Sequence, residues 1–176
     1  LSAYWVSNNE IIYYLDIYEQ GLDGNYTLTS STMRTGTKGN TISYNPPTKT
    51  GFQIDNAKST LSIANVSNDS QHLKVYYARN RYTIVYDSNY APGLPELFKT
   101  VPNVVHGSTL SGIPTAANLN ARENSRYFNF NGWKTARTSG TAASSNTVIS
   151  GNATYYAQWQ PVVGAAKITF DYNYVN

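Results

Sequence analysis

Hydrophobic and polar residues alternate along residues 11–18, and this alternation predicts a β-strand close to the start of the chain. Successive side chains of a strand point to opposite faces, so one face is expected to be buried, the face of Ile11, Tyr13, Leu15 and Ile17. The opposite face is expected to be partly wet and carries Tyr14, Asp16 and Tyr18. Residues 21–25 are rich in Gly and Asn and predict a hairpin loop, after which a second strand is expected over residues 26–29.

The following stretch has a weaker pattern. Residues 30–40 contain many Thr, Ser and Gly with little periodicity, which predicts a loop. A short strand is expected over residues 60–63, and a longer closing strand over residues 73–79 has Val75 and Tyr77 on one side. Only Asn80 separates this strand from the next one, so one folded unit is expected to pass into another almost without a linker.

The second half repeats this plan with insertions. After a first strand over residues 82–87, a second strand is expected to begin at residues 107–110. A helix is expected over residues 115–123, with Thr115 as its N-cap. An aromatic strand follows over residues 127–133, in which Gly132 is expected to admit the close approach of a backbone or a ring. A strand over residues 153–159 closes this part.

The closing strand recurs along the chain. Residues 153–159 resemble residues 73–79, and their ending appears again in residues 1–5. In the same way, residues 84–90 recur as residues 168–174. Such self-similarity is the signature of a repeat array. We therefore expect the end of a preceding repeat at 1–5, complete repeats at 6–80 and 81–160, and a linker with the first strand of a following repeat at 161–176.

Composition narrows the classes of function. The chain has 176 residues and no cysteine, which excludes disulfides, thiolate nucleophiles and Cys-ligated zinc. Its formal net charge of +3 comes from charges spread singly, whereas nucleic-acid binders usually cluster them on one face. No apolar run is long enough to cross a membrane, so we expect neither nucleic acid nor direct membrane insertion.

The residues that commonly carry catalysis or bind metals form no recognisable motif. His72 and His106 are expected to lie in different repeats, with no nucleophile and base around either, so no enzyme is expected. Asp16, Glu19 and Asp23 fall close together but lack the spacing of a calcium loop, so no metal or other cofactor is expected. The sequence leaves open whether a Lys–Asn isopeptide crosslink forms, because it does not identify which Lys, Asn and carboxylate would come together.

Tyrosine is the residue type that leaves two interpretations open. The chain has 16 Tyr, 5 Phe and 3 Trp, and such side chains bury large areas in small domains. Exposed rings can also stack on sugars, and the candidate ligand contacts are Tyr14, Tyr18, Tyr76 and Tyr156. The alternative is that these rings pack against neighbouring repeats and loops.

Several separated motifs carry a resemblance to a known family. Residues 128–133, Phe-Asn-Phe-Asn-Gly-Trp, are followed by a Gly/Ser-rich loop and by residues 153–159, Ala-Thr-Tyr-Tyr-Ala-Gln-Trp. In this order they resemble the Listeria/Bacteroides repeat, also called the internalin B-repeat, over roughly residues 82–159. Residues 18–28 resemble the Tyr-rich repeat often found beside it, which is similar in plan to mucin-binding-protein repeats.

The resemblance implies a fold, a location and a role. It implies an α+β, mostly β protein of two tandem β-grasp-like (ubiquitin-like) domains. It also implies a secreted cell-wall adhesin of a Gram-positive or related bacterium, located at the extracellular cell surface. We therefore expect a non-catalytic stalk or spacer that contacts neighbouring repeats and contributes to attachment to a host glycoprotein or glycan. The alternative is a carbohydrate- or mucin-binding module that uses exposed tyrosines.

Overall fold

The computed structural model describes residues 9–90, 97–119 and 128–164, and most of their regular structure is β-strand. This confirms the prediction of a mostly β protein. Contacts divide the chain into two compact units: unit 1 contains residues 1–82 and 104–108, and unit 2 contains residues 83–103 and 109–176. The recurrences at residues 1–5 and 168–174 lie outside the described residues, and the repeat boundaries at 6–80 and 81–160 stay predictions.

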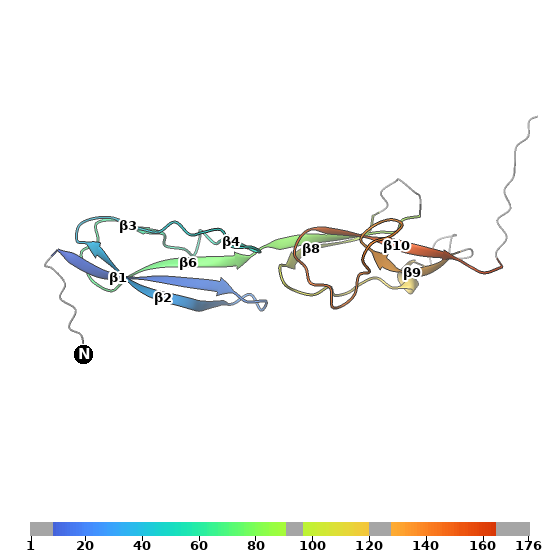
Figure 1. The fold of residues 1–176 in the computed structure, drawn as a ribbon, viewed down its shortest axis with the longest axis horizontal. Coiled ribbons are helices and arrows are strands. Elements are labelled where there is room, and N and C mark those ends of the chain that lie inside the picture. Colours follow the sequence, from blue (N-terminus) through green and yellow to red (C-terminus); the bar gives the residue numbers. More distant parts are fainter. Residues whose placement is uncertain (1–8, 91–96, 120–127, 165–176) are drawn as a thin grey trace, which may run out of the picture. The chain divides into compact units, whose positions relative to one another are not determined.

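Unit 1 is built on a four-stranded mixed sheet (Figure 1). Its strands in spatial order are β2 (Tyr26–Thr37), β1 (Glu10–Gln20), β6 (Gln71–Arg79) and β4 (Phe52–Ile54). The first strand, β1, pairs antiparallel with β2 and parallel with the last strand, β6. The short β4 pairs antiparallel with the other side of β6. The first and last strands of the unit are therefore direct neighbours.

The connection between β2 and β6 in unit 1 contains short strands. In addition to β4, it holds β3 (Ile42–Ser43) and β5 (Ser62–Ile63), which pair antiparallel as a separate two-stranded sheet. The predicted strand over residues 60–63 is therefore confirmed in its second half. No helix occurs in this connection, all of whose residues the structure describes.

The alternation along β1 is confirmed as the origin of the unit 1 core. Ile11, Tyr13 and Leu15 are buried, and they pack in one cluster with Leu73, Val75 and Tyr77 of β6. Asp16 corrects the expectation of a wet opposite face, since it is only 4% exposed. Neighbouring strands cover it: the Ser31 hydroxyl of β2 and the His72 ring of β6 both contact its carboxylate.

The predicted loop over residues 30–40 is wrong, because β2 continues to Thr37. Every residue from Ser30 to Thr37 has a partner on β1, so the backbone ladder, and not burial, defines the strand. Most of its side chains are exposed, which is why the sequence shows no hydrophobic alternation. The register shifts at the Ile17/Tyr18 step, where Thr29 is the extra residue of a β-bulge.

Unit 2 has the same strand order with different side chains. Its sheet runs β8 (Leu97–Val105), β7 (Arg81–Asp87), β10 (Ala153–Pro161) and β9 (Phe128–Lys134), and its first and last strands, β7 and β10, are again parallel neighbours. The second strand predicted at residues 107–110 is wrong, because β8 supplies it. Thr109 forms only an isolated bridge with Val148. Pro102 within β8 obscured the strand in the sequence.

A single short helix, α1 (Ala116–Leu119), is present among the described residues of unit 2. It begins directly after Thr115, as predicted, and Asn118 accepts hydrogen bonds from both the N–H and the hydroxyl of Thr115. The rest of the predicted helix, residues 120–123, lies outside the described residues. Within the described part of the chain, no helix is long and apolar enough to cross a membrane.

The core of unit 2 combines aromatic with aliphatic side chains. Tyr86, Trp133 and Tyr155 are buried, with Trp133 edge-on to Tyr86 at a centroid distance of 4.9 Å. The Trp133 indole N–H donates to the Pro114 carbonyl at 2.7 Å, which satisfies its polar group inside the core. Gly132 corrects a detail, since no atom lies close to the position of a Cβ; its φ of +90° is what favours glycine there.

Candidate functional site

Three of the four predicted tyrosines lie on one face of the unit 1 sheet. Tyr14 and Tyr18 alternate with the buried residues of β1, and Tyr76 does the same on β6. The parallel register aligns Tyr18 with Tyr76 and Tyr14 with His72. All three tyrosines are partly exposed. The sheet therefore presents a row of rings on the face opposite its hydrophobic core.

One end of this row is a compact cluster of three tyrosines. Tyr18 and Tyr76 stack with their centroids 4.4 Å apart and their planes within 7°, and Tyr26 of β2 meets Tyr76 edge-on at 5.1 Å. The Tyr26 hydroxyl donates to Asp55 at 2.9 Å. Burial and this hydrogen bond raise the pKa of Tyr26 to about 12, and burial, followed by the proximity of Tyr76, raises the pKa of Tyr18. These hydroxyls therefore stay protonated at neutral pH.

The other end of the row combines a ring pair with a buried carboxylate. Tyr14 stacks on His72 at 5.0 Å, and His72 Nδ1 lies 2.7 Å from Asp16. The Ser31 hydroxyl donates to the other oxygen of Asp16 at 2.6 Å. In a hydrolytic triad the histidine lies between the serine and the acid, whereas here the acid lies between the other two. This trio is arranged to hold three strands together, not to activate the serine.

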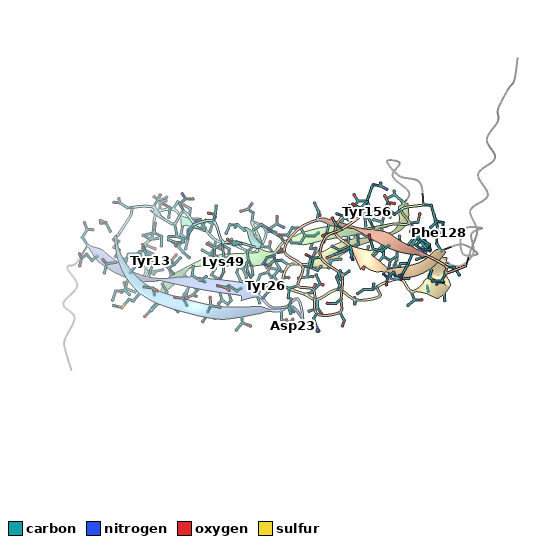
Figure 2. All side chains as sticks on the ribbon, turned by 45° about the vertical axis from the view of Figure 1, so that its right-hand side comes forward. Tyr13, Asp23, Tyr26, Lys49, Phe128 and Tyr156 are labelled. Carbon is teal, nitrogen blue, oxygen red and sulfur yellow. The ribbon has the colours of Figure 1, made fainter. Side chains whose placement is uncertain are left out.

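Tyr156 does not join the row, because it lies in unit 2 (Figure 2). The Arg137 guanidinium lies over its ring at 4.8 Å and also contacts Asp87 at 3.0 Å. Arg137 further donates to Asn89 Oδ1 at 3.0 Å. Tyr156 nevertheless occupies on β10 the position that Tyr76 occupies on β6, since both follow a buried residue of the last strand.

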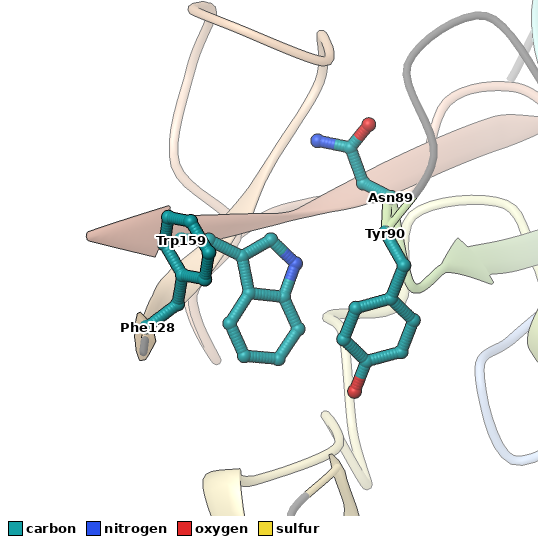
Figure 3. Close-up of a pocket in the computed structure, with 4 residues that line it drawn as sticks. All are labelled: Asn89, Tyr90, Phe128 and Trp159. Carbon is teal, nitrogen blue, oxygen red and sulfur yellow. The ribbon is translucent and has the colours of Figure 1, made fainter. Parts of the chain in front are cut away.

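A second aromatic group lines a shallow cavity of about 140 Å³ in unit 2. Figure 3 shows its lining, which consists of Asn89, Tyr90, Phe128 and Trp159. Tyr90 and Trp159 stack at 4.8 Å, and the Trp159 indole N–H donates to the Ser88 carbonyl. The Tyr90 hydroxyl donates to the Leu119 carbonyl, and the Asn89 amide bonds to carbonyls of unit 2. The cavity's polar groups are thus engaged with the protein, and its walls offer mainly apolar contact.

The remaining acidic residues and the histidines do not converge. Glu19 pairs with Lys49, whereas Asp23 accepts hydrogen bonds from Asn25, which lower the pKa of Asp23. His106 was expected in a different repeat from His72, but both fall in unit 1. There the His106 ring lies against Gly51, and not against the trio of Asp16, Ser31 and His72. The described residues hold no cluster of three metal-binding side chains.

Sequence reasoning named Tyr14, Tyr18 and Tyr76 as candidate ligand contacts, but it predicted neither their alignment nor three residues that join them. Tyr26, His72 and Asp55 come from strands and turns that are far apart along the chain, and the register brings them together. The period-two pattern of residues 71–79 is the signal that points to His72, because His72, Lys74 and Tyr76 alternate with Leu73, Val75 and Tyr77. No local pattern points to Tyr26 or Asp55.

Comparisons with known proteins give little further identification. No family model matches the chain, and no curated protein matches it. Among solved structures, domains 3–4 of the Streptococcal High Identity Repeats in Tandem (SHIRT) of a cell surface protein are similar, at 13% identity. That similarity covers 86% of this chain and 99% of the SHIRT chain, with a TM-score of 0.29. A TM-score of this size does not establish a shared fold.

Proposed function

We propose that this chain is a non-catalytic, load-bearing repeat segment of a bacterial cell-surface protein, which acts as a stalk at the extracellular surface. The observation that carries the proposal is the same in both units: the first strand pairs parallel with the last strand. The motifs shared with internalin B-repeats support the surface location. Neighbouring repeats of the same chain are its first partners, and a host glycoprotein or glycan is the expected target.

The parallel pairing determines how each unit meets a pulling force. In a parallel pair, the N-terminal end of the first strand and the C-terminal end of the last strand lie at opposite ends of the ladder. A force applied through the chain therefore shears the ladder and loads its hydrogen bonds together. Unit 1 has seven register pairs, from Tyr13 with Gln71 to Glu19 with Tyr77, and unit 2 has four.

The connection between the units fits this role. The last strand of unit 1 ends at Arg79 and the next strand begins at Arg81, so only Asn80 separates them. A force that leaves β6 therefore enters β7 after a single residue. A long flexible linker would instead have to be stretched before the next unit carried any load.

The strand order also supports the β-grasp-like description as part of this proposal. In each unit the spatial order of the sheet strands, numbered along the chain, is second, first, last and third, with the first and last parallel. Unit 1 departs from the expected α+β plan, since its fully described crossover contains short strands and no helix. The sheet, and not the crossover, is the common element.

Single-molecule force spectroscopy tests the load-bearing role. We call the parallel β1–β6 ladder of unit 1, and the β7–β10 ladder of unit 2, the parallel clamp of each unit. The chain lacks cysteine, so Glu10→Cys with Asn80→Cys provides two unique attachment points for pulling unit 1 along its clamp. The matched control keeps Glu10→Cys and replaces Asn80→Cys by Lys38→Cys, so that the force unzips the antiparallel β1–β2 hairpin one pair at a time. We expect a rupture force several-fold higher in the first geometry, because forced unfolding depends on the barrier along the pulled direction.

Two results would contradict the proposal. Equal rupture forces in the two geometries would show that the parallel clamp does not resist load. In a chain pulled from its two termini, unit 1 is expected to rupture at a higher force than unit 2, because its clamp is longer. The reverse order would show that the ladder does not determine the resistance.

A second candidate function is binding of a carbohydrate or a mucin at the tyrosine row of unit 1. The observation that favours it is that Tyr14, Tyr18 and Tyr76 share one partly exposed sheet face. Ring faces offer apolar area to sugars, and the phenol hydroxyls and Asp55 offer hydrogen bonds at the same place. This role is compatible with a stalk, since the row lies on the face opposite the core.

Binding to a glycan and mucin array tests this candidate. The variant carries Tyr14→Ser, Tyr18→Ser and Tyr76→Ser, and the matched control carries Tyr156→Ser, which removes a ring of the other unit. We expect saturable binding that the triple variant loses and the control keeps, with both samples checked for folding by circular dichroism. Absence of binding by the unsubstituted chain at high concentration would reject this function.

A further inference from the structure

The outer edge of unit 1 is a long strand with little protection. β2 lies at the end of its sheet, and among the described residues no strand pairs with its outer side. All of its 12 residues except Tyr26 and Gly36 are exposed. A free edge presents a row of unpaired N–H and C=O groups that can pair with another chain.

The corresponding edge of unit 2 is guarded. β8 contains Pro102, which has no N–H to donate, and Lys99, which opposes the approach of another strand. Asn103 interrupts it further with a φ of +62°. β2 has no proline, and Arg34 is its single charged residue. The two edges therefore differ in the features that normally prevent pairing between chains.

The ladder with β1 shows which backbone groups of β2 face outward. The Lys38 N–H donates to the Asn9 carbonyl at 2.9 Å, so this pair is a hydrogen-bonded one, and the type of pair alternates along an antiparallel ladder. The inward groups are then those of Thr32, Arg34 and Gly36. The N–H and C=O groups of Ser31, Met33 and Thr35 point away from β1.

The hydrogen bonds on the other side of β1 support this assignment of inward and outward residues. The Ile12 carbonyl accepts from the Ser70 N–H, and the Ile12 N–H donates to Asp69, so even-numbered residues of β1 bond away from β2. The odd-numbered residues, which face Arg34 and Gly36, bond toward β2. The hydrogen bonds on both sides of β1 therefore indicate that Ser31, Met33 and Thr35 point away from β1.

We propose that β2 pairs with β2 of a second copy of this chain, antiparallel and about a two-fold axis centred on Met33. In this arrangement Met33 lies opposite Met33 of the second copy, and Ser31 lies opposite Thr35 in both directions. The pairing joins the outward groups of Ser31, Met33 and Thr35. It also covers the Met33 side chain, which is 47% exposed in the single chain.

Three features select this register over its neighbours. The faces of the two sheets match only if the axis passes through a residue, because side chains alternate. An axis on Arg34 would place two like charges directly opposite each other, which is unfavourable. An axis on Thr32 would place Thr35 against Thr29, the extra residue of the bulge. The axis on Met33 avoids the charge pair and sets Arg34 opposite Thr32. It brings Thr29 only against Thr37, outside the outward groups of residues 31–35.

Self-association measured by sedimentation over a range of concentrations tests the proposal. We expect the unsubstituted chain to dimerise reversibly and Met33→Lys to raise the dissociation constant at least about tenfold, because two ammonium groups would then face each other. The matched control is Leu28→Lys, which adds the same charge to the same strand. Leu28 is similarly exposed, at 48%, and faces Tyr18 as Met33 faces Tyr14, but it lies beyond the bulge. The control is expected to dimerise like the unsubstituted chain.

Crosslinking gives an independent test that needs no loss of function. A hydrogen-bonded antiparallel pair has its Cα atoms about 5.5 Å apart, which a disulfide can span. Met33→Cys is therefore expected to form a disulfide-linked dimer on oxidation, and Leu28→Cys is not, in a chain that has no other cysteine. A chain that stays monomeric at every concentration, or equal crosslinking by the two variants, would overturn the proposal.

Discussion

Units 1 and 2 share one strand order but fill their cores with different side chains. The last strand shows this most clearly: β6 buries Val75 and Tyr77, whereas β10 buries Tyr155 and Ala157 at the corresponding positions. The large and small side chains have changed places, and unit 2 adds Trp133. The comparison teaches that the alternation of buried and exposed positions defines the sheet, while the volume at each position is adjusted within each unit.

The units also differ in which polar groups each one buries. Unit 1 buries Asp16 between two neighbouring strands, and the corresponding residue of β7 is the half-buried Val85. Unit 2 buries a different carboxylate, Asp87, which contacts Arg137 at 3.0 Å. It also buries the Tyr86 hydroxyl, which has no hydrogen-bond partner among the described residues. Substitutions at these positions should therefore affect the two units in different ways.

The largest expected effect follows removal of the aromatic core of unit 2. Trp133→Ala is expected to lower the free energy of unfolding of unit 2 by about 3–5 kcal/mol, because it leaves a cavity beside Tyr86 and removes the bond to Pro114. Urea unfolding should then show two transitions in place of one. Leu73→Ala is the matched change in unit 1 and should weaken that unit instead. If either variant shifted the unfolding midpoints of both units equally, the two cores would not be separate.

A smaller effect is expected for the buried carboxylate of unit 1. Asp16→Ala removes the acceptor shared by Ser31 and His72, and hydrogen bonds to a charged group contribute about 1.5–3 kcal/mol. Val85→Ala, at the corresponding position of unit 2, should lower stability by about 1 kcal/mol, since it removes part of a half-buried side chain. Thermal unfolding of the two variants measures the difference. A larger loss for Val85→Ala would reverse the comparison.

The same substitution is expected to have opposite signs in the two units. Tyr86→Phe should raise the stability of unit 2 by about 1 kcal/mol, because it removes a buried hydroxyl without a described partner. Tyr26→Phe should lower the stability of unit 1 by about 1 kcal/mol, because it removes the bond to Asp55. Chemical denaturation of both variants gives the two signs. Destabilisation by Tyr86→Phe would show that the hydroxyl has a partner.

The smallest effect is expected at alkaline pH. Burial and the bond to Asp55 raise the pKa of Tyr26 to about 12 in the folded chain, above the value of about 10 for an unfolded tyrosine. The folded state then holds its proton more tightly, so this contribution to stability is complete below pH 10 and is lost as the pH rises toward 12. Stability measured across this range should fall less steeply in Tyr26→Phe. An unchanged slope would contradict the assignment.

Sequence reasoning predicted the fold where burial alternates and failed where it does not. β1 and both closing strands follow a period of two. Residues 30–37 and β8 were missed for physical reasons: the former are exposed on both faces, and the latter contains Pro102. At an edge, backbone pairing alone maintains a strand, and it leaves no hydrophobic pattern to detect.

The candidate site was predictable only in part. Tyr14 and Tyr18 were placed on the outer face by their spacing within one strand. The pairing of Tyr18 with Tyr76 depends on a register between strands about sixty residues apart, and local patterns do not encode this register. The same reason explains Asp16: its burial depends on residues of two other strands, so its own neighbours in sequence suggested a wet position.

The parallel clamp of unit 1 also determines when the unit can fold. The β1–β2 hairpin joins residues close in sequence and can form early, whereas the pair of Tyr13 with Gln71 requires the closure of a long loop. Contacts between distant residues slow folding, and here they are the central ones. A chain lengthening from its N-terminus would therefore keep an incomplete sheet until β6 is present. A chain cut before residue 71 would leave the β1–β2 hairpin without β6, and an isolated hairpin is at best marginally stable.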